Sequence, residues 1–166
     1  MIGQGEQRPA SSIRIVAPTQ AHGPRLAELI RRSPPLDANS DYCYLLLCTH
    51  FAATSAVAEG ADGVLLGGVT AYRLPERPET LFIWQLVVAS EARGLGLAGR
   101  LVESVAARAA ATPLRWIETT VSPGNGPSNA VFDRFAARRG VTIARQPCFD
   151  PADFTSDHEA EAVSYT

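Results

Sequence analysis

The sequence predicts a single α/β domain in which a mixed central sheet of about six to seven strands is flanked by four helices. The chain has 166 residues, the usual length of one domain, and can bury a core without disulfides or structural metal. Hydrophobic residues make up 46% and charged residues 19%, as in ordinary globular proteins. Segments with strand and helix periodicity alternate along the chain, without internal repeats or an interdomain linker.

Composition and charge exclude several classes of protein. We interpret residues 1–11 as a flexible lead before a domain of residues 12–166; they lack the apolar core of a secretory signal. No apolar run approaches the roughly 18 residues of a membrane span. The net charge of −2 argues against a nucleic-acid partner. Cys43, Cys48 and Cys148 match no metal-site spacing and indicate reduced thiols. We expect a cytoplasmic protein without metal, nucleic acid or membrane.

The first part of the chain is expected to form a strand, two helices and two strands. The first strand covers 13–16, and a helix from Thr19 or His22 ends at the Ser33-Pro34-Pro35 segment. Asn39 or Ser40 is a suitable N-cap for the second helix. Strands follow at 55–59 and 64–72, and 74–79, with its two prolines, is expected to be a loop. The second helix carries an apolar stripe that consists of Tyr44, Leu47, Cys48 and Phe51. The strand at 64–72 contains Gly67 and Gly68, which indicate a bulge or a close backbone approach.

The second part begins with the most apolar segment, 81–89, which is expected to be the central strand. A long helix to about residue 111 and a strand at 114–121 follow. Pro127 is expected near the start of the next helix, which Gly140 ends. Further strands are expected at 141–145 and 162–165.

The segment RGLGLAG, from Arg93 to Gly99, has the form R-x-x-G-x-A and opens the long helix. A helix N-terminus exposes unpaired N–H groups, and glycines let a phosphate approach them closely. The segment therefore indicates a phosphate site. Its glycines also satisfy G-x-G-x-x-G, but a dinucleotide fold is less favoured. That motif needs its glycines directly after the strand, but residues 90–93 lie between. It also needs an acidic residue at the end of the next strand to bind the ribose, whereas Glu118 lies in the middle of that strand. Finally, too little chain follows to complete a dinucleotide-binding domain. A turn without any ligand is a further alternative.

The R-x-x-G-x-A turn after a central strand resembles motif A of the GCN5-related N-acetyltransferases (GNAT), and the order of elements agrees from Ile13 onward. The resemblance implies the GNAT fold and acetyl-CoA as cosubstrate. It implies that the turn binds the pyrophosphate, that the preceding strand binds the pantetheine arm and offers an N–H to the thioester oxygen, and that an Asn also contacts coenzyme A. The implied residues are Leu86, Val87, Val88, Arg93, Gly94, Leu95, Gly96, Leu97, Ala98 and Asn125. Phe132 stands where the family often has a Tyr that protonates the leaving thiolate, so the general acid and base stay unassigned.

Five separated blocks are similar to the diaminobutyrate acetyltransferases of ectoine biosynthesis: 34–59, 75–88, 93–101, 117–125 and the tail from Phe154 to Glu161. This resemblance implies acetyl transfer from acetyl-CoA to the γ-amine of L-2,4-diaminobutyrate. The product, N-γ-acetyl-L-2,4-diaminobutyrate, is later cyclised to ectoine. We expect direct attack in a ternary complex. Dimers are common in the family, so a homodimer is possible.

An acceptor with two ammonium groups and one carboxylate needs anionic residues and a hydrogen-bond donor. We expect Asp37 and Glu161 to hold the ammonium groups, Trp84 to wall the pocket, and His158 to donate to the carboxylate or accept a proton. The expected catalytic residues are thus Asp37, Trp84, Glu161 and His158; Tyr42 and Tyr44 are further substrate-binding candidates, and Arg77 is another candidate for the carboxylate. The two tyrosines straddle Cys43 and cannot both face one pocket from a regular helix. Each of these residues also has a purely structural interpretation.

Two other functions fit the same residues. One is a GNAT enzyme that acetylates another amine, such as a polyamine, an aminoglycoside or a protein N-terminus. The other is a non-catalytic acyl-CoA-binding module, which the phenylalanine at position 132 mildly favours.

Overall fold

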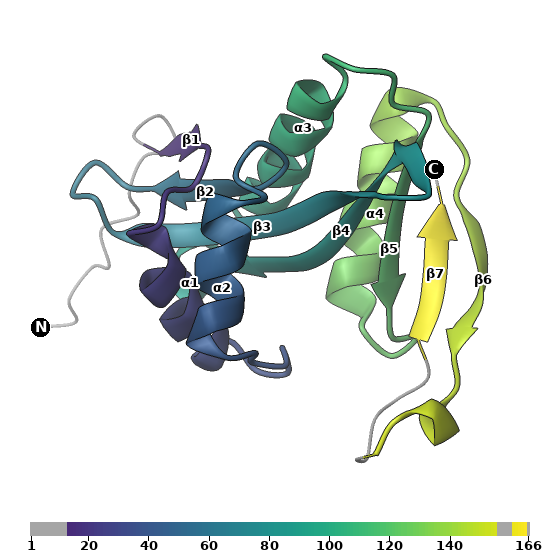
Figure 1. Ribbon diagram of the computed structural model, residues 1–166, viewed down its shortest axis with the longest axis horizontal. Helices are drawn as coiled ribbons and strands as arrows, with labels where there is room; N and C mark the ends of the chain where they lie inside the picture. Colours follow the sequence, from purple (N-terminus) through teal and green to yellow (C-terminus); the bar gives the residue numbers. More distant parts are fainter. Residues whose placement is uncertain (1–12, 156–160, 166) are drawn as a thin grey trace, which may run out of the picture.

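A seven-stranded sheet forms the centre of the computed structural model, which describes residues 13–155 and the backbone of residues 161–165. Figure 1 shows this sheet, whose strand order is β1-β2-β3-β4-β5-β7-β6. The predicted lead, residues 1–11, and His158 lie outside the described residues. The strands are β1 (Arg14–Val16), β2 (Ala56–Glu59), β3 (Leu65–Leu74), β4 (Arg77–Val88), β5 (Trp116–Val121), β6 (Ala144–Phe149) and β7 (Glu161–Tyr165).

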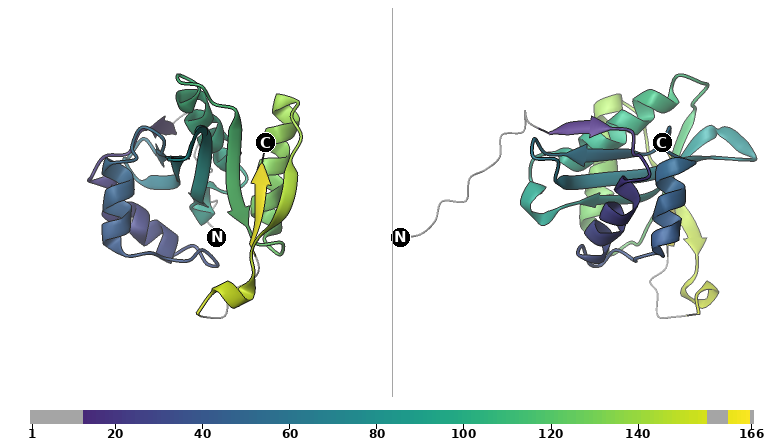
Figure 2. Two further views of the ribbon diagram at one scale, coloured as in Figure 1. Left: turned by 45° about the vertical axis from the view of Figure 1, so that its right-hand side comes forward. Right: turned by 60° about the vertical axis from the view of Figure 1, so that its left-hand side comes forward.

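Four α-helices cover the sheet, two on each face. Figure 2 shows α1 (His22–Arg31) and α2 (Asp41–Thr49) on one side, and α3 (Leu97–Ala109) and α4 (Gly126–Arg139) on the other. Two short 3₁₀ helices, η2 (Ser90–Ala92) and η3 (Pro151–Asp153), complete the described elements. The predicted α/β class, with a mixed sheet and four flanking helices, is confirmed.

The sheet is antiparallel from β1 to β4, and β5, β7 and β6 pair antiparallel with one another. The one parallel pairing among the described strands joins β4 to β5. A dinucleotide-binding fold requires a largely parallel, doubly wound sheet. The strand directions therefore exclude that alternative for the glycine turn.

The glycine pair of β3 serves close packing, as predicted. A Cβ atom on Gly68 would lie 2.7 Å from Leu26 Cδ1 of α1, and one on Gly67 would lie 2.9 Å from the Val87 carbonyl oxygen of β4. The contact at Gly67 is with backbone, which cannot move aside, so this position requires glycine, whereas a side chain at Gly68 would displace the end of Leu26.

The predicted N-terminus of α2 is confirmed at Ser40, whose hydroxyl oxygen accepts a hydrogen bond from the Cys43 N–H at 3.3 Å. Tyr44, Leu47 and Cys48 are buried on the predicted stripe. Phe51 lies beyond the end of the helix and is 40% exposed, with its ring 5.8 Å from that of Tyr72. The predicted stripe is therefore correct for the three residues within α2 but not for Phe51.

Two predictions of segment bounds were wrong, and both observed strands contain a proline. The expected loop at 74–79 is mostly strand, because β3 continues to Leu74 and β4 begins at Arg77. Pro78 is tolerated because the register between β3 and β4 shifts there, between Arg73 and Leu74. The strand expected at 141–145 lies instead at Ala144–Phe149 and includes Pro147. That strand is the last in the sheet, and an edge strand can lack an N–H donor.

Candidate functional site

The site lies where β4 and β5 separate. The two strands pair from Thr80 opposite Trp116 to Ile83 opposite Thr119, and no pairing follows. Figure 1 shows them side by side near the β3–β4 turn and diverging towards their other ends. At the last pair, the Thr119 hydroxyl donates to the Ile83 carbonyl at 2.9 Å. Beyond Ile83, β4 pairs with β3 on one side only, so its other edge is open to a ligand.

One cavity, of about 700 Å³, extends from this open edge to the N-terminus of α3. Leu86, Val87 and Val88 line it from β4, and Asn125 lines it from the loop before α4. Of the predicted turn residues, Leu95 alone does not line the cavity and packs against the core. The others line it as expected: Arg93, Gly94, Gly96, Leu97 and Ala98.

The glycine turn presents free backbone donors to this cavity. Gly96 is the N-cap of α3, has φ +68°, and provides no side-chain cap. The first N–H groups of a helix have no partner within the helix, and the helix dipole makes this end electropositive. A Cβ atom on Gly96 would meet nothing within 4 Å, so the turn leaves its backbone accessible. These features suit a phosphate group, and the apolar strand edge beside them suits an extended pantetheine chain.

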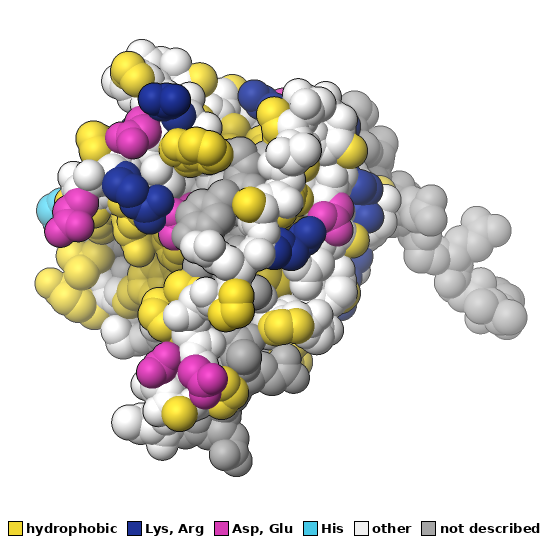
Figure 3. Space-filling view, turned by 90° about the vertical axis from the view of Figure 1, so that its right-hand side faces the viewer, with side chains coloured by type: hydrophobic (Ala, Val, Ile, Leu, Met, Phe, Trp, Pro, Cys, Tyr) yellow, Lys and Arg dark blue, Asp and Glu magenta, His cyan; other side chains and the backbone are white. Residues whose placement is uncertain are grey.

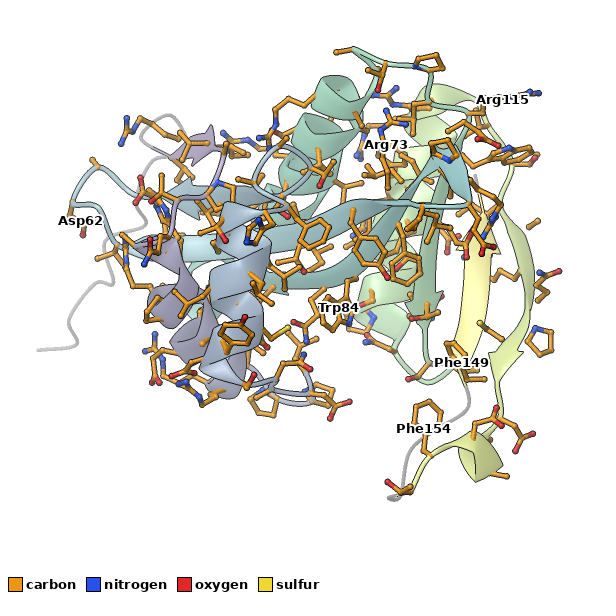
Figure 4. The ribbon with its side chains drawn as sticks, viewed as in Figure 1. Asp62, Arg73, Trp84, Arg115, Phe149 and Phe154 are labelled. Carbon is orange, nitrogen blue, oxygen red and sulfur yellow. The ribbon has the colours of Figure 1, made fainter. Side chains whose placement is uncertain are left out.

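A second cavity, of about 760 Å³, continues from the first towards the C-terminal part of the chain. Six residues line both cavities, so they form one cleft: Pro35, Leu36, Leu86, Asn125, Pro127 and Ser128. Asp37 and Trp84 line the second cavity, together with Phe149 and Phe154. Figure 4 shows Trp84 on β4 between α2 and β5, and the two phenylalanines at the lower ends of β6 and η3.

A β-bulge places Trp84. Thr70 of β3 lies opposite Gln85 and Ala71 opposite Ile83, so Trp84 has no partner in β3. Its side chain is 37% exposed, whereas that of Ile83 is buried. The bulge thus directs an indole to the second cavity at the point where β5 departs, and contact of this indole with the acceptor stays a prediction.

The loop that carries Asp37 is fixed to β4. The Gln85 side-chain amide donates to the Asp37 carbonyl oxygen at 2.7 Å. Asn39 also lines the second cavity, and its N–H donates to the buried Tyr44 hydroxyl at 3.0 Å. Asp37 is exposed and lines the second cavity.

The structure gives the two tyrosines of α2 different surroundings, as helix geometry predicts. Tyr44 is fully buried in the core, where it supports the Asn39 loop. Tyr42 is 67% exposed. Neither lines the two cavities, so direct substrate contact by Tyr42 or Tyr44 stays a prediction. Arg77 forms an ion pair with Glu118 at 2.8 Å, at the opposite end of β4 from Val88.

The predicted residues of the tail are only partly described. His158 lies outside the described residues, and Glu161 is described by its backbone alone, as the first residue of β7. That backbone pairs with Phe149, which lines the second cavity. The roles of His158 and Glu161 stay predictions.

Asn125 has a structural role in addition to lining both cavities. Its side-chain oxygen accepts from the Ser128 N–H at 3.1 Å and caps α4. Phe132, also on α4, is 5% exposed and lines the second cavity. The hydroxyl that a tyrosine would provide is therefore missing at this point of the cleft.

The cysteines do not point to a covalent acetyl-enzyme. None of the three lines either cavity. Burial raises the pKa of the Cys48 thiol to about 11, and burial also raises the pKa of Cys43. A thiol needs a lowered pKa to act as a nucleophile near neutral pH.

The two ends of the cleft differ in charge. Among the described residues, the first cavity is lined by Arg93, Arg134 and Arg138 and by no acidic residue. The described lining of the second contains Asp37 as its one charged side chain. An anionic ligand therefore suits the turn end, and a cationic one suits the end near Trp84.

Sequence reasoning missed Gln85, Phe149, Phe154 and the two arginines of α4. Arg134 and Arg138 are four residues apart, a spacing that places them on one face of a helix and offers a signal in the sequence. Contact between Gln85 and the Asp37 loop depends on tertiary structure, and no local pattern indicates it.

Within the described ranges, no helix combines the length and apolar character of a membrane span. Nor do three or more potential metal-ligating His, Cys, Asp or Glu side chains come together in the described part of the chain.

Comparisons with known proteins agree with this architecture. Residues 24–137 match the model of the acetyltransferase (GNAT) family. The L-2,4-diaminobutyric acid acetyltransferase of Streptomyces coelicolor is 43% identical over 155 residues, covering 92% of this chain and 91% of that protein. The corresponding protein of Streptomyces avermitilis is 42% identical over 153 residues, covering 91% and 86%.

A solved structure gives the same result. The diaminobutyrate acetyltransferase EctA from Paenibacillus lautus, in complex with its substrate L-2,4-diaminobutyric acid and coenzyme A, superposes with a TM-score of 0.88 at 35% identity. The match covers 92% of this chain and 93% of that one. The chain described here therefore belongs to the diaminobutyrate acetyltransferases of the GNAT family.

Proposed function

We propose that this protein transfers the acetyl group of acetyl-CoA to the γ-amine of L-2,4-diaminobutyrate and forms N-γ-acetyl-L-2,4-diaminobutyrate for ectoine biosynthesis. The charge division of the cleft carries the proposal. Acetyl-CoA brings phosphates, which suit the arginine-lined end at α3. Diaminobutyrate brings two ammonium groups, which suit the end that contains Asp37. The two ends meet at Leu86, on the open edge of β4.

The reaction requires no covalent intermediate on the protein. The deprotonated γ-amine attacks the thioester carbonyl carbon, the carbon–sulfur bond breaks, and coenzyme A leaves as a thiolate while the new amide loses its proton. The open edge of β4 at Leu86–Val88 offers backbone groups to the pantetheine arm and an N–H to the developing oxyanion. A thiolate is stable enough to leave without a strong general acid, which accounts for a cleft with Phe132 in place of a tyrosine.

Binding and activation of the amine place opposite demands on its pKa. An alkylammonium has a pKa near 10.4 in water. The apolar ring of Trp84 lowers this value by desolvation, and the Asp37 carboxylate raises it. We assign Asp37 and Glu161 to the ammonium groups and His158 to the substrate carboxylate or the released proton. Support for the two tail residues comes from Phe149 and Phe154, which bring the flanking chain to the second cavity.

Turnover with a panel of amines tests the proposal. Release of free thiol from acetyl-CoA would be followed with L-2,4-diaminobutyrate, ornithine, lysine and spermidine. We expect kcat/KM for diaminobutyrate to exceed the others by about a hundredfold or more, because longer chains misplace the amine by an ångström or more. Equal rates with another amine would favour a different acceptor. Tight binding of coenzyme A without any turnover would favour an acyl-CoA-binding module.

Removal of the Asp37 charge tests the acceptor end separately. Asp37→Asn should raise the KM for diaminobutyrate by about tenfold or more and leave the KM for acetyl-CoA unchanged, since a charge-assisted hydrogen bond contributes about 1.5–3 kcal/mol. An equal rise in both KM values would contradict the assignment.

We further propose that the enzyme acts in the cytoplasm and as a homodimer, with no nucleic-acid or membrane partner. The odd number and the spacing of the three cysteines predict reduced thiols, which supports a reducing compartment. All side chains of β6 are exposed in the single chain, and Phe149 is 48% exposed. Figure 3 shows apolar and charged side chains interspersed on the face to which this strand belongs. Sedimentation equilibrium should give twice the mass of 17.7 kDa, and a mass equal to one chain would refute the dimer.

A further inference from the structure

The first cavity gathers most of the arginines that have no partner. Among residues 13–155, the guanidinium groups of four arginines form neither an ion pair nor a hydrogen bond: Arg93, Arg115, Arg134 and Arg138. Three of these four line this one cavity, and no acidic residue lines it with them. The other described arginines are bound to carboxylates or carbonyl groups. Unpaired cations concentrated on one concave surface indicate an anionic ligand with several charges.

Helix α4 provides two of these three cations. Arg138 lies over the first turn of α3, because its guanidinium Nη2 is 3.1 Å from the position that a Cβ atom on Gly99 would take. Arg134 lies one helical turn earlier and therefore on the same face of α4. Both arginines line the cavity at which the α3 N-terminus lies, and the Arg138 guanidinium lies against the first turn of that helix.

The charges of coenzyme A exceed what the turn can bind. Its pyrophosphate matches the turn N–H groups with Arg93 beside them, which is the arrangement that the GNAT resemblance implies. Coenzyme A carries one further phosphate, a phosphomonoester on the 3′-oxygen of its ribose. A guanidinium is the side chain best shaped for a phosphomonoester, because it donates two parallel hydrogen bonds.

We propose that Arg134 and Arg138 bind the 3′-phosphate of coenzyme A and make this enzyme select coenzyme A over its dephospho form. The proposal rests on the use of acetyl-CoA proposed above. It adds two specificity-determining residues that lie outside the glycine turn. Since neither arginine lines the second cavity, their effect should be confined to the cosubstrate.

Calorimetric titration with coenzyme A and with 3′-dephospho-coenzyme A tests the proposal without turnover. The variants are Arg134→Gln, Arg138→Gln and the double variant. Arg139→Gln is the matched control, because Arg139 is the next residue of α4 and is paired with Glu103 at 2.8 Å. It removes the same charge from the same helix but does not line the cavity. Thermal unfolding of each ligand-free variant shows whether the fold is intact.

We expect the wild type to bind coenzyme A about tenfold or more tightly than the dephospho form, which corresponds to one good charge-assisted contact. The double variant should bind both ligands equally, with the affinity that the wild type has for the dephospho form. Arg139→Gln should behave as the wild type. Equal losses for both ligands would place the arginines at the pyrophosphate and overturn the assignment. Unchanged binding in the double variant would overturn it as well. If the wild type bound neither ligand, the use of acetyl-CoA itself would be refuted.

Discussion

Gly96 combines a left-handed backbone with a place at the phosphate end of the cleft. Its φ of +68° would strain any other residue by about 1–2 kcal/mol. Gly96→Ala should therefore lower the free energy of unfolding by this amount. It should also weaken coenzyme A binding by about tenfold or more, because the new methyl group would occupy the space through which a phosphate reaches the turn.

Gly63 provides the matched control for this prediction. It lies in the turn between β2 and β3 with φ +75°, and a Cβ atom there would also meet nothing within 4 Å. Gly63→Ala should lose the same stability in urea unfolding without any change in coenzyme A affinity. Similar losses of affinity in both variants would show that strain, rather than a phosphate at the turn, is responsible.

Cys48 makes stability depend on pH in the alkaline range. Burial raises the pKa of its thiol from the ordinary 9.0 to about 11. The folded state thus favours the neutral thiol, so this contribution is complete below pH 9 and is lost as the pH rises through 11. The loss should reach roughly 2–3 kcal/mol, the equivalent of a two-unit shift in pKa.

Replacement of the thiol checks that dependence. The unfolding free energy of Cys48→Ala should fall less between pH 9 and 11 than that of the wild type, although its value at pH 7 is lower because a buried side chain is truncated. A thiol-specific disulfide reagent at pH 8 should react first with Cys148, which is exposed, and then with Cys43, which is partly buried. Cys48 is buried and should react only when the protein unfolds. Rapid modification of Cys48 in the native protein would contradict its burial.

Among the elements, the C-terminus of α3 is capped by Arg73, a side chain of β3. The Arg73 guanidinium donates to the carbonyl oxygens of Ala109 and Pro113 and, at 2.6 Å, to the Thr112 hydroxyl. Figure 4 shows Arg73 near the upper end of α3. A cation at a helix C-terminus also interacts favourably with the dipole.

Arg73→Ala should therefore reduce the free energy of unfolding by about 1–2 kcal/mol, because the partly buried Ala109 carbonyl and the exposed Pro113 carbonyl lose a charged donor. Arg115→Ala is the control, since the Arg115 guanidinium forms no ion pair or hydrogen bond with the described residues and Arg115 lies directly before β5. Urea unfolding would measure both. Equal stabilities of the two variants would show that the cap contributes nothing.

A hydrogen bond from the Gln85 side chain connects β4 to the loop that carries Asp37. Gln85→Leu removes the donor that holds the Asp37 carbonyl at 2.7 Å, and Gln85→Glu removes the donor but keeps the side-chain length. Both should raise the KM for diaminobutyrate by about tenfold, because the loop that carries the carboxylate is no longer fixed. The KM for acetyl-CoA should stay constant. A Gln85→Glu enzyme with wild-type KM values would show that the hydrogen bond has no positioning role.

The order and class of most elements could be predicted from local signals. Ser40 as a cap, the stripe of α2 and the glycine turn each act within a few residues of their own position. The two prolines of the segment 74–79 misled the prediction of a loop, because tolerance of Pro78 depends on a register shift between β3 and β4. The bounds of β6 depend on its pairing with β7, which no local pattern indicates.

At the scale of the whole molecule, the site depends on contacts that no local pattern encodes. Gln85 and Asp37 are 48 residues apart, and Arg138 meets Gly99 only because α3 and α4 pack side by side. The turn and Trp84 were accessible to sequence reasoning because chemistry and spacing coincide there. The charge division of the cleft emerged only when these distant segments were brought together.

A single turnover tests the central claim most directly. Enzyme saturated with [1-¹³C]acetyl-CoA would be mixed with L-2,4-diaminobutyrate, and the quenched mixture would be analysed by NMR and by mass spectrometry of the intact protein. We predict that the label appears on the γ-nitrogen in an amount equal to the coenzyme A released, with no acetylated protein at any time. Label on the α-nitrogen, or an acetylated protein that forms before the product, would contradict the direct transfer across this cleft.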